Sequence, residues 1–401
     1  MGTYSKLTPK GTRDILFEEC AAQREARRRL SQVFSLRGYH EVLTPGLEFF
    51  DVFNLPGAAI PQQEMYKCTD NQGRLLVLRP DSTLPIARMA ASRLQQRQKP
   101  LRFYYGQTVY RNSPDLSGRN DECAQMGIEL MGAQGLRADL EVIAAGVEAL
   151  STCVENFRVE IGHAGFFRAL ADQLPLSQGE REQLRTTIES KNYAALSELL
   201  DPLEPTPAVE AMRRLPRLFG GQEVLAQAER WCEGDAAQML EYLQTLYSAL
   251  GQLGLGDRLM VDLGLVQRND YYTGMVFSAY VEDQGDAVLL GGRYDKLCEK
   301  FGAPMPAVGF SIDLDAVASL LGEGAPAPQG AEVLVFGEEG REVQALEQVA
   351  ALTRAGARCE SALCSTLEEA LAYAREGGIP KVLWVGEALR EIPVTREEEQ
   401  P

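Results

Sequence analysis

The sequence is poor in the residues that hold metal ions. It has only two histidines, His40 and His163, and its eight cysteines are scattered without a C-x-x-C pair. Because structural zinc sites draw four ligands from closely spaced Cys and His residues, we expect no zinc site and no other cofactor. The cysteines are Cys20, Cys68, Cys123, Cys153, Cys232, Cys298, Cys359 and Cys364. We expect them to be reduced thiols.

Long apolar runs are also missing. No stretch approaches the length of a membrane span, and the first residues lack the pattern of a secretory signal. With 401 residues, 45% hydrophobic and 24% charged, the composition is that of a globular protein with two or three domains. We therefore expect a cytoplasmic protein without membrane contact.

Positive charge is scarce, since the formal net charge is −17. The nearest approach to a basic run is Arg24–Arg29, inside a predicted helix over Phe17–Leu36. The apolar residues of that helix have helical spacing, so its arginines belong to a solvated face. Binding of a nucleic-acid backbone normally needs a concentrated basic surface, and this composition counts against an RNA partner.

Two strand-like runs stand out among the residues that are present. Phe103–Tyr110 is aromatic and β-branched, and Cys123–Leu130 alternates, so the pair predicts a hairpin. On the second strand Gln125, Gly127 and Glu129 share one face, and the bare glycine leaves space there. An edge strand with a solvated polar face has the same pattern. Arg111, which ends the first strand, favours a ligand site over this edge strand.

Composition divides the chain into three parts. Residues 1–321 alternate strand and helix, with a stretch of paired helices over about 165–257 inserted in a mixed sheet. Residues 322–330 have the composition of a linker. Residues 331–401 follow a β-α-β-α-β pattern, which predicts a small parallel sheet. Gly291-Gly292 is predicted as a turn that leads into a helix.

Several short segments along the chain carry a resemblance to a known family. They are the hairpin described above, Pro9–Asp14, Gly38–Pro45, Leu78–Thr83, Asp270–Thr273, Gly291–Asp295 and Pro306–Phe310. In their order and spacing they resemble the signature motifs of class II aminoacyl-tRNA synthetases, and among these of histidyl-tRNA synthetase. The resemblance covers roughly residues 5–320. It implies an α+β fold with an antiparallel sheet core, a helical insertion and a shortened C-terminal domain like the anticodon-binding domain.

The resemblance also implies a pocket for an amino acid. Its residues would be Asp81, Thr83, Arg111, Gln125, Glu129, Tyr272 and Tyr294. The two carboxylates suit an α-ammonium, the arginine suits an α-carboxylate, and the two tyrosines can line an imidazole slot. Ordinary packing would explain any one of them alone, whereas together they favour a histidine pocket. Tyr271 alternates to the other face and is expected in the core.

The half-site for ATP is altered. In the family three arginines stabilise charge around the ATP phosphates, and only Arg111 remains here. The other two positions are Gln267 and Ala316. In the loop of the predicted hairpin, Ser113 stands where the family has a glutamate. Each lost charge-assisted hydrogen bond removes about 1.5–3 kcal/mol, so the rate of adenylate formation would fall roughly hundreds- to thousands-fold. Arg268 could stand in for Gln267, but no comparable residue replaces Ala316.

A histidine pocket beside a disabled ATP site resembles the regulatory subunits of ATP phosphoribosyltransferase. That resemblance implies a non-catalytic homodimer, with Phe17–Pro45 at the two-fold interface, that binds L-histidine and not tRNA. It would activate a short-form catalytic subunit of ATP phosphoribosyltransferase and confer feedback inhibition at the first step of histidine biosynthesis. Two alternatives need ATP turnover: an active histidyl-tRNA synthetase with divergent arginines, and a synthetase-like enzyme that charges another acceptor.

Overall fold

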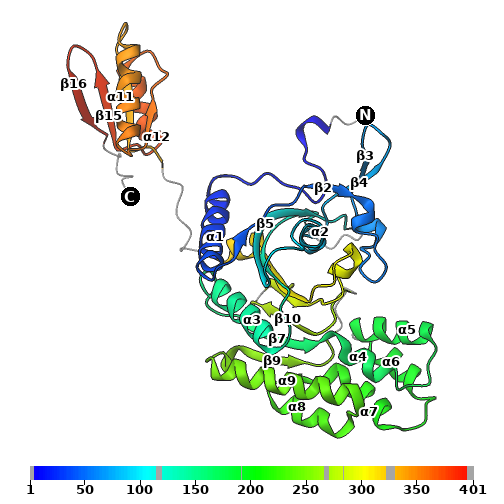
Figure 1. Ribbon diagram of the computed structural model, residues 1–401. Coiled ribbons are helices and arrows are strands. Elements are labelled where there is room, and N and C mark those ends of the chain that lie inside the picture. The colour runs from blue at the N-terminus through cyan, green and yellow to red at the C-terminus, as the bar shows by residue number, and fades with distance from the viewer. Residues whose placement is uncertain are drawn as a thin grey trace. The chain divides into compact units, whose positions relative to one another are not determined.

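The computed structural model describes residues 4–113, 120–190, 192–265, 271–282, 284–321 and 330–394. The chain forms two compact units, Met1–Ala325 and Pro326–Pro401 (Figure 1). Among the described residues no helix combines the length and the apolar character that crossing a membrane requires.

Strands and helices of the first unit are as follows. The strands are β1 (His40–Glu41), β2 (Leu47–Phe49), β3 (Lys67–Thr69), β4 (Leu75–Leu78), β5 (Leu101–Tyr110), β6 (Glu122–Met131), β7 (Arg158–His163), β8 (Phe219–Gly220), β9 (Leu259–Asp262), β10 (Met275–Tyr280), β11 (Leu289–Arg293) and β12 (Ala307–Asp313). The helices are α1 (Phe17–Leu36), α2 (Thr83–Arg93), α3 (Leu136–Ser151), α4 (Ala164–Ala171), α5 (Gln178–Glu189), α6 (Tyr193–Leu200), α7 (Pro207–Arg214), α8 (Glu223–Ala228), α9 (Gly234–Gln252) and α10 (Leu314–Ser319).

One mixed sheet organises this unit. Within the described part of the chain its order is β1-β5-β6-β12-β11-β10-β7-β9-β8, and a smaller sheet has the order β2-β4-β3. The β1–β5 and β7–β9 pairs are parallel, and the other neighbours in the large sheet are antiparallel. The predicted hairpin is confirmed as β5 and β6, which pair along their whole length. The mixture of a mainly antiparallel sheet with helices is the predicted α+β class.

The two faces of the large sheet are covered by different helices. Figure 1 shows β5 curving around α2, with α1 and α3 on the outer side. Leu84 and Ile86 of α2 pack in one buried cluster with Tyr105 of β5. Ile128 and Leu130 of β6 point the other way and pack with residues of α1 and α3. Because strand side chains alternate, the α2 face receives the other residues of β6, including the predicted site residues.

Gly291-Gly292 was predicted as a turn, and this is wrong. Both glycines lie inside β11 and pair with β10 and β12. A Cβ atom on Gly291 would lie 2.5 Å from the Phe277 ring, and one on Gly292 would lie 2.7 Å from the Tyr272 ring. The glycines therefore make room for aromatic rings on a buried strand, a use of glycine that also occurs outside turns.

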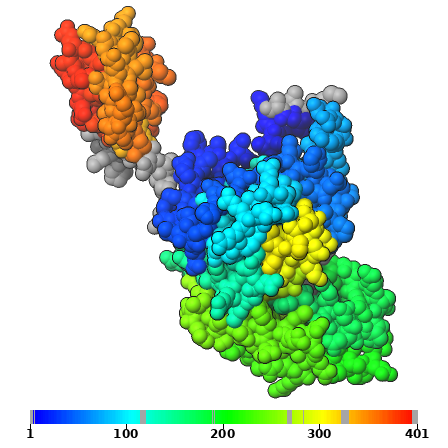
Figure 2. Space-filling model, viewed as in Figure 1, coloured from blue at the N-terminus to red at the C-terminus, as the bar shows by residue number. Residues whose placement is uncertain are grey.

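Helices α4 to α9 follow one another between β7 and β9, interrupted only by short elements such as β8. Figure 2 shows them in green, packed into one lobe at an end of the first unit. The prediction of long paired helices is only partly right, because the chain breaks into shorter ones. Capping side chains of Ser177, Asn192 and Thr206 begin α5, α6 and α7, and such residues favour new helix starts over continuation.

The second unit is a small sheet with one helix on each face. Its strands are β13 (Val333–Gly337), β14 (Cys359–Ser361), β15 (Lys381–Val385) and β16 (Leu389–Pro393), and its helices are α11 (Glu342–Arg354) and α12 (Leu367–Glu376). The order is β14-β13-β15-β16 among the described residues, and the first three strands are parallel as predicted. The sequence pattern missed β16, which forms a hairpin with β15 and pairs antiparallel to it.

Candidate functional site

Glu129 lies near the centre of the large sheet on β6, with only 1% of its surface exposed. The Thr83 hydroxyl donates a 2.8 Å hydrogen bond to its Oε1 atom, and the Tyr294 hydroxyl donates to its Oε2 atom. Burial raises the pKa of Glu129 to about 8, although the two hydrogen bonds act against the shift. The Asp81 charge adds to the increase. Among the described residues no Lys or Arg lowers the pKa of this carboxyl group, so burial disfavours its charged form.

Asp81 lies between β4 and α2 and is also buried. Its Oδ1 atom accepts the backbone N–H of Leu84 at 2.9 Å, so part of its acceptor capacity serves to begin α2. Burial raises the pKa of Asp81, and the nearby charge of Arg111 opposes that shift. The Arg111 side chain is held there because its Nε atom donates to the Pro80 carbonyl at 2.8 Å.

Three tyrosines line the same region. The ring centroids of Tyr271 and Tyr272 are 4.9 Å apart, and those of Tyr271 and Tyr294 are 5.8 Å apart in an edge-on arrangement. Tyr271 is buried as predicted, but it lies beside the predicted pocket residues and hydrogen-bonds Asp81. The expectation that it alternates away is wrong because both tyrosines precede β10, where the strand alternation does not apply.

Two glycines leave space for side chains of the site. A Cβ atom on Gly309 of β12 would clash with the carboxylate of Glu129. Gly127 was predicted to leave open space, and this is wrong: a Cβ there would lie 2.7 Å from the Tyr105 hydroxyl and would also meet the Phe310 carbonyl. The space belongs to a buried tyrosine of β5.

Tyr105 is a site residue that the sequence reasoning missed. It pairs with Gly127 across the hairpin, and its pKa is raised by burial and by the charges of Glu129 and Asp81. A large residue opposite a glycine in the predicted hairpin was the available signal. Ser82 was missed as well. It is buried, and its hydroxyl has no hydrogen-bond partner within the described part of the chain.

The predicted pocket residues are not all joined. Glu129, Thr83 and Tyr294 are directly hydrogen-bonded, and Asp81 interacts electrostatically with Glu129. Gln125 lies four positions along β6, half-buried and opposite Gln107 and Asp313 of the neighbouring strands. Among the residues that the structure describes, no hydrogen bond joins Gln125 to the rest of the set.

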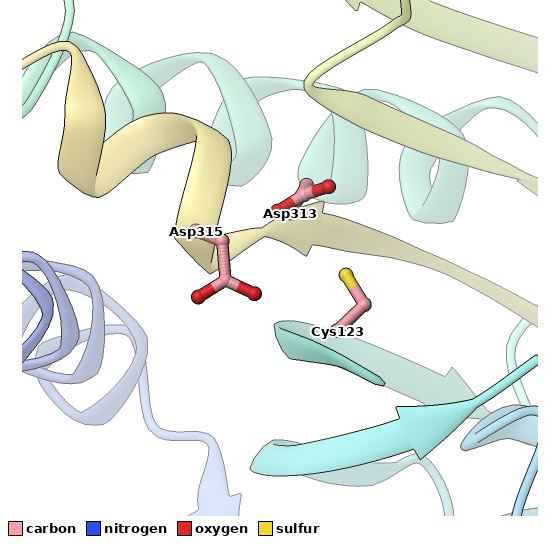
Figure 3. Close-up of side chains that lie close together, drawn as sticks. All are labelled: Cys123, Asp313 and Asp315. Carbon is pink, nitrogen blue, oxygen red and sulfur yellow. The ribbon is translucent and has the colours of Figure 1, made fainter. Parts of the chain in front are cut away.

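At the far end of the β6–β12 pair, three side chains converge. Figure 3 shows Cys123, Asp313 and Asp315, whose sulfur and oxygen atoms lie within 4.8 Å of one another. Asp313 Oδ1 accepts the backbone N–H of Ala316 at 3.0 Å, and Asp315 Oδ2 accepts that of Ala124 at 2.9 Å. Burial and the two carboxyl groups raise the pKa of the Cys123 thiol. Metal ligation by cysteine needs the thiolate, so internal hydrogen bonding explains this cluster better.

The altered synthetase positions fall in two places. Ala316 lies in the first turn of α10, beside the carboxyl groups of Asp313 and Asp315, and has no charge of its own. Ser113 follows β5, and its backbone N–H donates to Asp121 at 3.1 Å. Gln267 lies outside the described residues.

The chemical groups gathered here match those of a site for a small cationic group. Buried acidic groups, hydroxyl donors and a wall of aromatic rings suit an ammonium attached to a ring-bearing molecule. At Ala316, a position where the resemblance implies an arginine, the structure has an uncharged side chain with acidic neighbours.

Comparison with known proteins gives consistent matches. The family model for histidyl-tRNA synthetase matches residues 11–317. A protein of Clostridium kluyveri named ATP phosphoribosyltransferase regulatory subunit is 41% identical over 322 residues, which is 79% of this chain and 82% of that protein. A protein of the same name from Clostridium acetobutylicum is 38% identical over 389 residues, with 95% and 96% of the two chains covered.

Solved structures agree. The crystal structure described as an ATP phosphoribosyltransferase regulatory subunit/histidyl-tRNA synthetase from Bacillus halodurans has a TM-score of 0.83 and 30% identity, and the match covers 96% of this chain and 100% of that one. A histidyl-tRNA synthetase from Nostoc sp. PCC 7120 has a TM-score of 0.74 at 20% identity, with 96% of each chain covered, and supports the fold alone. The predicted class II synthetase-like fold is thereby confirmed.

Proposed function

The chain belongs to the histidyl-tRNA synthetase family, in the branch of the ATP phosphoribosyltransferase regulatory subunits, and from this we propose that it is a non-catalytic, histidine-binding subunit. It activates a separate short-form catalytic subunit of ATP phosphoribosyltransferase. Free L-histidine then inhibits the complex, at the first step of histidine biosynthesis. The protein works in the cytoplasm as a homodimer, without tRNA.

The observation that carries this proposal is the pair of acidic groups Glu129 and Asp81 beneath a tyrosine wall. Both carboxyl groups are buried, and burial raises the pKa of each. An α-ammonium would supply the missing opposite charge, while the rings of Tyr272 and Tyr294 offer a slot for imidazole. Arg111 beside Asp81 is available to the α-carboxylate.

The altered half-site for ATP favours a regulatory role and not the activity of a synthetase. Ala316 stands beside two carboxyl groups, and these would repel the phosphates that an arginine attracts. The loss of charge-assisted contacts is worth several kcal/mol at about 1.5–3 kcal/mol each. Adenylate formation by this chain is therefore not expected, and the phosphoribosyl chemistry resides in the partner.

An experiment with the assembled complex tests the proposal. The purified chain is mixed with a short-form catalytic subunit, and phosphoribosyl transfer is followed while histidine is titrated. We expect activation by the chain and inhibition by histidine. Glu129→Gln should keep activation and lose most of the inhibition, because only the charge partner of the ligand is removed.

The synthetase alternatives are tested separately by histidine-dependent exchange between pyrophosphate and ATP. Robust exchange by the native protein, together with no effect on the catalytic subunit, would refute the regulatory proposal. An active histidyl-tRNA synthetase would also transfer histidine to tRNA, whereas an enzyme for another acceptor would show exchange alone.

A further inference from the structure

The end of β11 joins two parts of the first unit. Arg293 is the last residue of the strand and Tyr294 follows it, and their side chains contact different elements, Asp139 of α3 and Glu129 of β6 respectively. Tyr294 donates to Glu129 on the α2 face, in the proposed histidine pocket. Arg293 extends toward α3, on the face where the helical lobe packs.

Arg293 is held by several acceptors at once. Its Nε atom donates to Asp139 at 2.9 Å, and its Nη1 atom donates to Asp295 at 2.8 Å and to the Ala133 carbonyl at 3.2 Å. Asp139 is 1% exposed and Arg293 is 6% exposed, so this ion pair is desolvated. Removing one partner of such a pair leaves an uncompensated buried charge, which is strongly destabilising.

Asp139 extends the connection to the helical lobe. Its second oxygen accepts a hydrogen bond from the Tyr242 hydroxyl on α9. The Tyr242 ring in turn lies edge-on to His163, with ring centroids 6.5 Å apart. His163 accepts the backbone N–H of Gly165 at 3.1 Å and so begins α4, the first helix of the lobe.

The backbone around Tyr294 is fixed as well. Thr273 donates its N–H to the Arg293 carbonyl at 2.7 Å, and the Tyr294 N–H donates to Ala307 at 2.8 Å. A Cβ on Gly274 would lie 2.9 Å from the aliphatic part of the Arg293 side chain, so the backbone of Gly274 packs closely against that part and restricts its movement. A movement of Tyr294 must therefore be taken up by Arg293 and its partners.

We propose that Asp139 and Arg293 are positioning residues for the ligand pocket, and that the Tyr242 hydroxyl couples the pocket to the helical lobe of residues 164–252. The coupling to histidine rests on the proposed function. Coupling between sites is reciprocal. A variant in which the lobe loses this hydrogen bond should therefore bind histidine more weakly in the pocket, and bound histidine should reduce local unfolding of the lobe.

Tyr242→Phe tests the coupling with little risk to folding, since it removes one hydroxyl and keeps the ring. Tyr247→Phe, the same change on the same helix, is the matched control. By calorimetry we expect the dissociation constant for histidine to rise about fivefold or more for Tyr242→Phe, the lower bound of typical couplings, and to stay unchanged for the control.

Hydrogen exchange gives a second readout. In the wild type and the control, histidine should slow amide exchange in α9, and in Tyr242→Phe this protection should be lost. Equal affinity and equal protection in both variants would overturn the coupling.

A comparison without ligand separates this inference from the proposed function. Amides of residues 289–297 should exchange faster in Tyr242→Phe than in Tyr247→Phe, because Arg293 loses part of its support. If the wild type binds no histidine, this result counts against the proposed function only. Equal exchange at residues 289–297 in the two variants would refute the positioning role. Arg293→Lys, which keeps the charge but lacks the guanidinium fork, should show the same faster exchange.

Discussion

The Tyr294 hydroxyl donates a hydrogen bond to the Glu129 carboxylate across a separation of 165 residues in the sequence. The Thr83 hydroxyl donates to the other carboxylate oxygen, so both oxygens accept a hydrogen bond, and within the described part of the chain no Lys or Arg pairs with this group. Hydrogen bonds of this kind hold the carboxyl group in one orientation. A ligand ammonium would meet an acceptor that is already positioned, and less ordering entropy would oppose its binding.

Glu129→Gln should weaken histidine binding by about 1.5–3 kcal/mol, the range for a hydrogen bond to a charged group. The amide keeps the size of the side chain, its oxygen can accept from one of the hydroxyls of Thr83 and Tyr294, and its NH2 group can donate to the other, so the fold should persist. Calorimetric titration of both proteins measures the difference. Equal affinities would show that the ammonium is placed elsewhere, and a wild type that binds nothing should be titrated again with the catalytic subunit present.

Histidine binding should release a proton near pH 7. Burial raises the pKa of Glu129 to about 8, so this group is mostly protonated before the ligand arrives. An adjacent ammonium favours the ionised form and drives the proton off. Titrations at pH 7 in buffers of different ionisation enthalpy should report release of about one proton by the wild type and none by Glu129→Gln. No buffer dependence in the wild type would contradict this assignment.

The stability of the ligand-free protein should depend on pH through the same group. Its pKa is 4.5 when unperturbed and about 8 in the fold, so between these values the folded state binds the extra proton. The free energy of unfolding therefore falls as pH rises from about 4.5 to about 8, by up to about 1.4 kcal/mol per unit. Urea unfolding of the wild type and of Glu129→Gln at several pH values isolates this contribution, and parallel curves would refute it.

Gly309→Ala should damage the fold and the pocket together. The added methyl group would clash with the Glu129 carboxylate and the Ile128 carbonyl, and overpacking of this kind typically costs about 1–3 kcal/mol. We expect a lower melting temperature and no histidine binding. Gly179→Ala is the control, since its Cβ would meet no atom within 4 Å and alanine favours the helix α5. Similar losses in both variants would contradict the expectation.

Strong periodic patterns made part of the fold predictable from the sequence. Helix α1 has the predicted bounds Phe17–Leu36 because its apolar residues recur at helical spacing. The prediction of a turn at Gly291-Gly292 was wrong because glycine occurs both in turns and in strands that are crowded by aromatic rings. Strand β16 was missed because its register depends on β15 and not on a local signal.

The candidate site was predictable only as a set of residues, through the family resemblance. The contact of Tyr294 with Glu129 depends on the pairing of strands across the sheet, and that of Arg293 with Asp139 on the packing of α3 against the sheet, and no local pattern contains either. Tyr105 was overlooked because its role follows from pairing with Gly127 across the hairpin. The assignment of the seven pocket residues to histidine stays a prediction until binding is measured.

The chain should be a homodimer at micromolar concentration. Large apolar side chains remain exposed in Phe17–Pro45, here called the motif 1 segment because Gly38–Pro45 resembles the first signature motif of class II synthetases. Phe17 is 73% exposed, Leu36 79% and Leu43 69%. Burial of such groups is favourable by about 25 cal/mol per Å², and a closed two-fold contact is the usual way to cover one patch on each of two identical chains.

Leu43→Glu should shift this equilibrium toward the monomer, because a carboxylate in the contact would have to be desolvated. Leu253→Glu is the matched control, since Leu253 is also exposed, at 58%, but lies at the end of α9, outside this segment. Sedimentation equilibrium measures the association, and circular dichroism checks that each variant is folded. A monomeric wild type would contradict the predicted dimer. Equal dissociation of both variants would place the dimer contact on another surface. In a wild-type dimer that only Leu43→Glu dissociates, the interface must include the motif 1 segment.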